Sequence, residues 1–135
     1  IEISKNFKMK IFGIGTDIVK VSRIKKLIIN KKFLKRLFNK DEIKKCSESK
    51  NTSSCYAKRF AAKEAFSKAL GTGISKGLSF NEIIILNENS GKPYIKLIDP
   101  TKKIVEKKLK KKKYKISLSL TDEKNYAVAF VTISI

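Results

Sequence analysis

Two acidic residues stand beside features that suit chemistry. Asp17 ends an apolar run containing Gly13 and Gly15, where the main chain can approach a ligand closely. Glu64 stands four residues before Lys68, which places the two side chains on one face of a helix. Two carboxylates suit Mg²⁺, which takes one or two protein oxygens and completes its octahedron with waters and substrate phosphates. A cation beside them could hold phosphate or take part in proton transfer.

Each of these features also has a purely structural interpretation. Asp17 could end a strand or cap the following helix, and Glu64 with Lys68 could form a surface ion pair of about 0.3–0.5 kcal/mol. The glycine-rich segment 71–77 could line a phosphate or adenosine pocket, or simply end a helix. Because it follows the predicted helix rather than preceding one, a Walker-type NTPase is disfavoured.

Composition limits both the chemistry and the partners. The 135 residues include no histidine, which excludes Ser-His-Asp and Cys-His catalysis and any His-ligated zinc. The 32 Lys and Arg exceed the 12 Asp and Glu by 20 charges, which favours a polyanionic partner. The cations are 29 Lys and 3 Arg beside 19 Ile and 8 Asn, so A/T-rich codon usage accounts for part of the excess.

Three further features of the sequence predict its compartment, its relation to membranes and its domain bounds. Cys46 and Cys55 could form one bridge, but they are too few for a disulfide framework, and we expect reduced thiols in a reducing compartment. No apolar run approaches the roughly 20 residues of a membrane span, so we expect no membrane association. Residues 1–9 are predicted as an extension, either a trimmed targeting remnant or added residues, before a single domain at 10–135.

Periodicity predicts the elements of the first half. A short buried strand is expected over 11–18, followed by a helix over 23–39 that Ser22 caps, with an irregularity near Asn30. Asp41 is expected to cap a short helix ending near Cys46, before a polar loop at 47–54.

The strongest predicted helix spans 55–70 and ends at Gly71 and Gly73. Stepping 100° per residue gathers an apolar arc on one side and a polar group on the other. The apolar arc consists of Ala61, Ala62, Ala65, Phe66, Ala69 and Leu70, and the polar group of Lys63, Glu64, Ser67 and Lys68.

The last third predicts strands. A hairpin is expected from 80–86 and 93–97, and a second from 115–120 and 126–133, whose apolar content suggests central strands. The region 99–115 is expected to begin as a helix and to end in a lysine tract. Strands grouped without βα alternation predict an α+β fold with an antiparallel sheet.

Four segments resemble holo-acyl-carrier-protein synthases, the small 4′-phosphopantetheinyl transferases. They are GIGTDIV at 13–19, RFAAKEAFSKALGTGISKGLSF at 59–80, SGKPY at 90–94 and ISLSLTDEKNYAVAFV at 116–131. The resemblance implies the 4′-phosphopantetheinyl transferase fold, with an antiparallel sheet packed on a long central helix. It also implies a homotrimer with active sites between neighbouring subunits.

The activity implied by the resemblance is Mg²⁺-dependent transfer of 4′-phosphopantetheine from coenzyme A to a serine of apo acyl carrier protein, in fatty acid biosynthesis. Holo acyl carrier protein and adenosine 3′,5′-bisphosphate are the products. The family's motifs place the metal ligands at Asp17 and Glu64, which are also catalytic together with Lys68. They place coenzyme A contacts at Arg59, Ser67, Lys68, Gly71 and Thr121.

One position departs from the family pattern. Leu120 stands where the family has a histidine near the coenzyme A phosphates, and leucine can neither donate to phosphate nor relay a proton. The base for the serine proton stays open between Glu64, a metal-bound water or hydroxide, and a neutral Lys68. Arg23 matches a family docking arginine, so Arg23 and Lys26 are expected to meet the acidic carrier protein.

A second hypothesis is a basic RNA- or ribosome-associated module that uses residues 102–115 without catalysis. The sequence lacks the aromatic-interleaved and GXXG-type motifs of such modules, so we expect no nucleic-acid partner. The resemblance places the enzyme in the cytoplasm of a bacterium or in an apicoplast-type plastid of a parasite.

Overall fold

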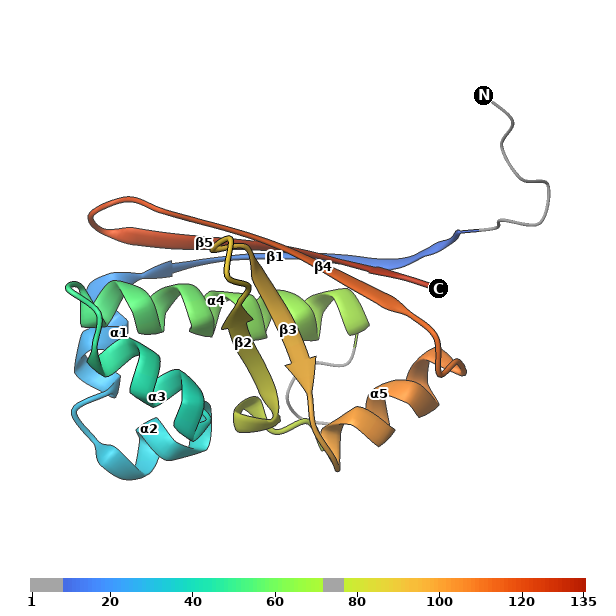
Figure 1. The fold of residues 1–135 in the computed structure, drawn as a ribbon, viewed down its shortest axis with the longest axis horizontal. Helices are drawn as coiled ribbons and strands as arrows, with labels where there is room; N and C mark the ends of the chain where they lie inside the picture. The colour runs from blue at the N-terminus through green and yellow to red at the C-terminus, as the bar shows by residue number, and fades with distance from the viewer. Residues whose placement is uncertain (1–8, 72–76) are drawn as a thin grey trace.

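The computed structural model describes residues 9–71 and 77–135, which form two antiparallel sheets and a set of helices (Figure 1). The larger sheet has the strand order β1-β5-β4, and the smaller one pairs β2 with β3. Helix α4 (Thr52–Leu70) lies between the larger sheet on one side and α1, α3 and β2 on the other. The predicted α+β fold, with an antiparallel sheet on a long central helix, is confirmed.

Two glycines let β1 (Ile11–Lys20) approach α4 closely. A Cβ atom on Gly13 would overlap the carbonyl oxygen of Ala69, and one on Gly15 would overlap that of Ala65. Alternate residues of a strand share a face, so Asp17 continues the row that Gly13 and Gly15 begin on the side facing α4. Because Gly13 and Gly15 have no Cβ atom, β1 packs directly on α4 and the Asp17 carboxylate lies close to the helix.

The long helix α4 is buried on nearly every side. Asn51 caps its start by accepting a hydrogen bond from the Ser54 amide at 3.1 Å, and Gly71 ends it in the left-handed conformation with φ of 84°. The prediction over 55–70 is therefore confirmed, with a start at Thr52. The expectation of one polar side is wrong for Lys63 and Ser67, which are buried because α3 and β2 cover that side of the helix.

Two helices replace the single helix expected over 23–39. They are α1 (Val21–Leu27) and α2 (Lys31–Leu37). The break falls at Asn30, whose side chain caps α2 by accepting hydrogen bonds from the amides of Lys32 and Phe33 at 3.0 and 3.3 Å. Ser22 is not the cap of α1, since the helix begins at Val21 after a residue without a side-chain capping bond.

Helix α3 (Lys40–Ser47) is capped by Asn39 rather than by Asp41, with Glu42 completing the capping box. Cys46 of this helix forms a disulfide with Cys55 of α4, so the prediction of two reduced thiols is wrong. Packing of α3 on α4 brings the two Cα atoms to 5.4 Å, within the range in which a bridge can close. The cysteines therefore no longer point to a reducing compartment.

The first predicted hairpin begins later than expected. A 3-10 turn, η2 (Phe80–Glu82), precedes β2 (Ile83–Asn87), which pairs with β3 (Pro93–Leu97). Helix α5 (Thr101–Leu109) then ends before the lysine tract. Gly73 and Lys76 of the glycine-rich segment lie outside the described residues.

The second hairpin, β4 (Lys115–Asp122) with β5 (Tyr126–Ser134), is confirmed, but only β5 is central. Strand β4 lies at an edge because β1, from the other end of the chain, takes the free side of β5. The expectation that β1 is buried is wrong for its outer face. Ile14 and Ile18 are exposed there, and Phe130 lies between them in the register of the neighbouring strand.

None of the helices in the two described ranges is both long and apolar enough to span a bilayer.

Candidate active site

Asp17, Glu64 and Lys68 meet where β1 crosses α4. The Lys68 ammonium donates hydrogen bonds to the Asp17 carboxylate at 3.2 Å and to the Thr16 carbonyl oxygen at 3.0 Å. Among the described residues, the ion pair of Lys68 is with Asp17 and not with Glu64. The close approach that Gly13 and Gly15 allow thus joins a strand carboxylate to a helix lysine.

Glu64 is half-buried, and its pKa lies above the ordinary value for glutamate. Burial is the main cause, the negative charge of Asp17 adds to it, and the positive charges of Lys68 and Arg23 oppose it. The two carboxylates therefore lie close enough to repel one another, and a divalent cation between them would relieve that repulsion.

The donor set at this point fits Mg²⁺. Within residues 9–71 and 77–135, no cluster brings together three or more His, Cys, Asp or Glu side chains that could hold a metal. Asp17 and Glu64 supply two carboxylates, the number for which Mg²⁺ leaves room for waters and phosphate oxygens. The site is thus unlike a closed structural metal site, which fills its coordination from protein alone.

Helix α1 carries the two predicted docking residues, and one of them lies near this site. The Arg23 guanidinium lies over the ring of Phe60, 6.0 Å from its centroid, and its charge is felt at Glu64. Lys26 stands in the last turn of α1 and is exposed. Both predicted docking residues are therefore exposed on α1, and Arg23 is the one whose charge acts on the Glu64 carboxylate.

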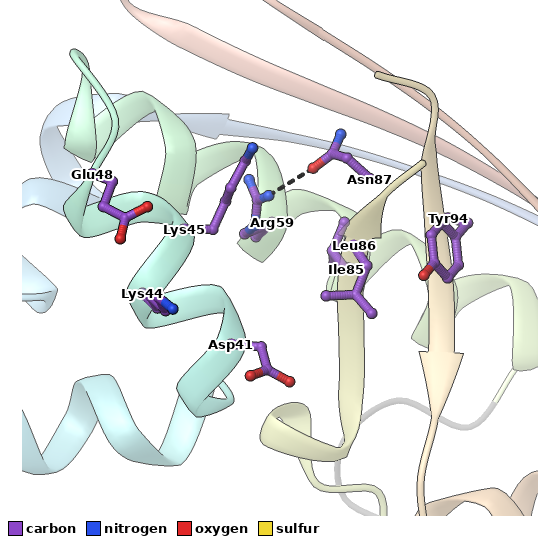
Figure 2. Close-up of a pocket in the computed structure, with 9 residues that line it drawn as sticks. All are labelled: Asp41, Lys44, Lys45, Glu48, Arg59, Ile85, Leu86, Asn87 and Tyr94. Atoms are coloured by element: carbon purple, nitrogen blue, oxygen red, sulfur yellow. Dashed lines mark hydrogen bonds between the residues drawn. The ribbon is translucent and has the colours of Figure 1, made fainter. Parts of the chain in front are cut away.

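A cavity of about 360 Å³ opens between α3 and the β2–β3 hairpin (Figure 2). Its walls come from α3, β2, β3 and α4, with Arg59 pointing between α3 and β2. The lining residues are Asp41, Lys44, Lys45, Glu48, Arg59, Ile85, Leu86, Asn87 and Tyr94. Five of these side chains are charged, and three of the five are cations, so the cavity suits a polar, anionic ligand better than an apolar one.

Arg59 is the buried cation of this region, with 5% of its surface exposed. One terminal nitrogen donates to the Asn87 side chain at 3.0 Å, and the other contacts the Cys55 carbonyl oxygen at 3.3 Å and sulfur at 3.1 Å. Its Nε has no hydrogen-bond partner within the described parts of the chain. Burial lowers the pKa of Arg59, while the Glu42 carboxylate opposes this. A buried guanidinium with a spare donor suits an anion.

An adjoining cavity of about 740 Å³ shares Lys45, Glu48, Arg59 and Asn87 with the first. Leu120 lies in its wall, beside Lys58 and Asp122, which form an ion pair at 3.8 Å. The position that departs from the family pattern therefore lines an open cavity whose wall holds both basic and acidic side chains.

The remaining predicted coenzyme A residues lie apart from one another. Ser67 is buried, and its hydroxyl has no hydrogen-bond partner in residues 9–71 and 77–135. Gly71 is the exposed C-cap of α4, and Thr121 is exposed on the edge strand β4 opposite Val128. The structure thus brings together Asp17, Glu64 and Lys68, and it places Arg59 separately in the cavities.

Comparison with known proteins identifies the family. The model of the 4′-phosphopantetheinyl transferase superfamily matches residues 13–131, and this chain therefore belongs to that superfamily. A holo-[acyl-carrier-protein] synthase of Pelagibacter ubique is 48% identical over 125 residues, which cover 93% of this chain and 98% of the relative.

Two solved structures share the fold at 35–36% identity. A holo-(acyl-carrier-protein) synthase from Bacillus anthracis in complex with CoA (3′,5′-ADP) is 35% identical, with a TM-score of 0.76 over 94% of this chain and 98% of that one. The enzyme from Neisseria meningitidis is 36% identical, with a TM-score of 0.80 over 92% and 98%. The expected transferase fold is confirmed, and the RNA-binding alternative gains no support.

Proposed function

We propose that this chain transfers 4′-phosphopantetheine from coenzyme A to a serine of apo acyl carrier protein in fatty acid biosynthesis. The products are holo acyl carrier protein and adenosine 3′,5′-bisphosphate. The observation that carries this proposal is the convergence of Asp17, Glu64 and Lys68 at the crossing of β1 and α4. The family membership of residues 13–131 supports the same reaction.

Asp17 and Glu64 would hold Mg²⁺ in this enzyme. When bound, the ion supplies charge neutralisation on the pyrophosphate of coenzyme A. The fit rests on the two neighbouring carboxylates and their mutual repulsion. The proposal predicts that Asp17→Asn weakens Mg²⁺ binding, which calorimetric titration of the metal measures without any turnover.

The residues around the metal position would carry the proton and the charge. The serine oxygen forms a bond to the β-phosphorus while the bond to the leaving adenosine 3′,5′-bisphosphate breaks. Glu64 is the carboxylate that we assign to take the serine proton, since burial and the neighbouring charge of Asp17 raise its pKa and so favour proton uptake. Lys68 is exposed enough to exchange Asp17 for a substrate phosphate and to stabilise the charge that develops there.

Coenzyme A would extend from this site toward the two cavities. Arg59 would bind one of its phosphates, which is supported by its place in the walls of both cavities. Lys45 and Lys58 line the same cavity as Leu120 and would supply cations there in place of the histidine, once a phosphate displaces Asp122 from Lys58. We keep Ser67, Gly71 and Thr121 as coenzyme A contacts on the family resemblance.

The acidic carrier protein would dock on α1. Arg23 and Lys26 are both exposed on α1, and the charge of Arg23 acts on Glu64. Complementary charge speeds the encounter of two proteins and sets their orientation. Replacing both with Glu is expected to raise the KM for the carrier protein and to leave the KM for coenzyme A unchanged. Equal changes in the two constants would contradict a dedicated docking face.

We further propose that the chain acts as a homotrimer with active sites between subunits. The outer face of the three-stranded sheet presents exposed Ile14, Ile18 and Phe130, an apolar patch suited to burial against other copies. Ile18→Asp is expected to shift the mass measured by light scattering from three chains to one. A wild-type mass of one chain would contradict the trimer.

We propose the bacterial cytoplasm as the cellular setting, which the bacterial source of the Pelagibacter ubique relative supports.

One experiment tests the reaction directly. The protein is incubated with coenzyme A, Mg²⁺ and an apo acyl carrier protein, and the carrier is weighed by mass spectrometry. The expected result is a mass gain equal to the phosphopantetheine arm, absent when coenzyme A is omitted. A carrier whose mass stays constant while the protein is folded would contradict the proposed function.

A further inference from the structure

A buried ion pair that the proposed chemistry does not use lies at the junction of three elements. The side chains of Lys63 on α4 and Glu42 on α3 are both 0% exposed. The Lys63 ammonium donates to the Glu42 carboxylate at 2.6 Å and to the carbonyl oxygens of Phe80 and Ile83, each at 2.7 Å. An ammonium has three protons, so all of its donors are used.

The Glu42 carboxylate is equally well satisfied. Besides Lys63, it accepts a hydrogen bond from the Asn39 amide at 2.9 Å and one from the Ile85 amide at 3.1 Å. The amide of Asn39 lies at the start of α3, and that of Ile85 lies in β2. The pair therefore ties together α3, α4 and the segment from η2 into β2.

These three elements are also walls of the 360 Å³ cavity. Asp41, Lys44 and Lys45 of the cavity are neighbours of Glu42 along α3, and Figure 2 shows them facing Ile85 on β2. The amide of Ile85 donates to the Glu42 carboxylate. Arg59 stands one turn before Lys63 on α4, so both side chains leave the helix on the side that faces β2. The distance between α3 and β2 is thus set by the carboxylate that bridges them.

Stability alone does not require an ion pair in this place. Apolar residues of similar volume usually pack as well as a buried ion pair, because both charges must be desolvated. An apolar pair, however, could not bond the carbonyl oxygens of Phe80 and Ile83 or the amide of Ile85. What the charges add is a fixed position for the β2 main chain relative to α3 and Arg59.

We propose that Glu42 and Lys63 are positioning residues, which hold Arg59 and the facing walls of the cavity at the separation that the phosphate end of coenzyme A requires. This inference rests on the proposed function, in which Arg59 binds a coenzyme A phosphate. The pair of Glu42 and Lys63 acts through Arg59 and its hydrogen-bond partner Asn87, not through contact with the reacting atoms.

The test compares three variants with the wild type. Lys63→Met removes the charge, and Glu42→Asp keeps the charge but shortens the bridge by one methylene, so that the pair moves without being broken. Val105→Ala is the control, since it removes buried methyl groups from α5, which does not line the cavity. Calorimetry measures the Kd for coenzyme A and for 3′,5′-ADP, and steady-state assays give kcat and both KM values.

Both pair variants are expected to raise the Kd for coenzyme A and for 3′,5′-ADP by about 10-fold or more, which corresponds to the loss of one well-placed charged hydrogen bond. The kcat and the KM for the carrier protein should change less than about 2-fold, as expected when an interaction with one substrate alone is lost. In an Arg59→Met background the effect of Glu42→Asp should disappear, because residues that act through one another are coupled.

A purely structural role gives a different result. It predicts that Glu42→Asp and Val105→Ala both lower Tm while the folded protein keeps the wild-type Kd, and this outcome overturns the positioning role even where Lys63→Met fails to fold. A Val105→Ala variant that loses affinity as much as Glu42→Asp also overturns it. Failure of the wild type to bind coenzyme A would instead overturn the proposed function, and the positioning role with it.

Discussion

Helix α4 carries two lysines that each pair with a carboxylate from another element, and the two pairs differ in exposure. In the pair of Lys68 with Asp17 the side chains are 57% and 17% exposed, and their atoms are 3.2 Å apart. In the pair of Lys63 with Glu42 both are 0% exposed, and the atoms are 2.6 Å apart. Two lysine–carboxylate ion pairs made by one helix are therefore held in opposite environments, one exposed and one buried.

The difference indicates which pair can exchange its partner. An exposed ion pair contributes only about 0–1 kcal/mol, so Lys68 can leave Asp17 for a substrate phosphate at little cost. Breaking a buried pair leaves an uncompensated charge and costs about 3–5 kcal/mol. The pair on the β1 side is thus suited to chemistry, while the pair on the β2 side is suited to holding a shape.

The largest effect is expected at the exposed site, from Glu64→Gln. Loss of the proton acceptor and of a metal ligand should lower kcat by roughly 10³-fold, or about 4 kcal/mol in the barrier, with little change in Tm. Mass spectrometry of the carrier protein at saturating coenzyme A measures the rate, and Glu106→Gln on α5 is the control. Near-native rates in both Glu64→Gln and Asp17→Asn would rule out the metal assignment.

The next effect concerns the buried pair. Lys63→Met is expected to lower the free energy of unfolding by about 3–5 kcal/mol, because Glu42 is left charged and buried. Urea denaturation followed by circular dichroism checks this. A double variant with Glu42→Leu should recover part of the loss, and a single variant as stable as the wild type would mean that the two pairs do not differ.

The disulfide supplies a third and smaller effect on the same side of α4. Cys46 and Cys55 are separated by nine positions, and opening so short a loop should cost roughly 2–3 kcal/mol. Tm with and without dithiothreitol measures it, and the Cys46→Ala/Cys55→Ala variant should no longer respond to the reductant. If dithiothreitol does not change the wild-type Tm, the ion pair of Lys63 with Glu42 is the main link between α3 and α4.

The smallest stability effect is expected from Lys68→Met, at about 1 kcal/mol or less. Its kcat should nevertheless fall by roughly 10²-fold, since a preorganised charge is lost at the reacting phosphate. This combination, opposite to that of Lys63→Met, is the sharpest form of the comparison. An unchanged kcat with a weaker affinity for coenzyme A would make Lys68 a binding residue only.

Local patterns were enough to predict most of the exposed site. Two glycines before Asp17 point to a close approach of the main chain there, although β1 continues past Asp17 to Lys20, and the spacing of Glu64 and Lys68 fits one helix face. The resemblance to the transferases then assigned their roles. Such features lie within a few residues of one another, so they need no knowledge of how α3 or β2 packs.

The buried side could not be predicted in the same way. Lys63 was placed with Glu64 and Ser67 on a polar face, and only the packing of α3 and β2 over that face buries it. One signal was present, since Asn39 followed three residues later by Glu42 is a capping-box spacing. The expectation that Asp41 caps this helix does not use that capping-box signal. The Cys46–Cys55 bridge likewise depends on a tertiary distance that no spacing reveals.

In the proposed trimer, the face of Ile14, Ile18 and Phe130 would have a consequence for gene dosage. An enzyme whose active sites form only between subunits obeys mass action, so its active fraction depends on the concentration of free chains. Specific activity should then fall on dilution in the test tube. In the cell, the rate of carrier-protein modification should then fall by a larger factor than the expression of the chain.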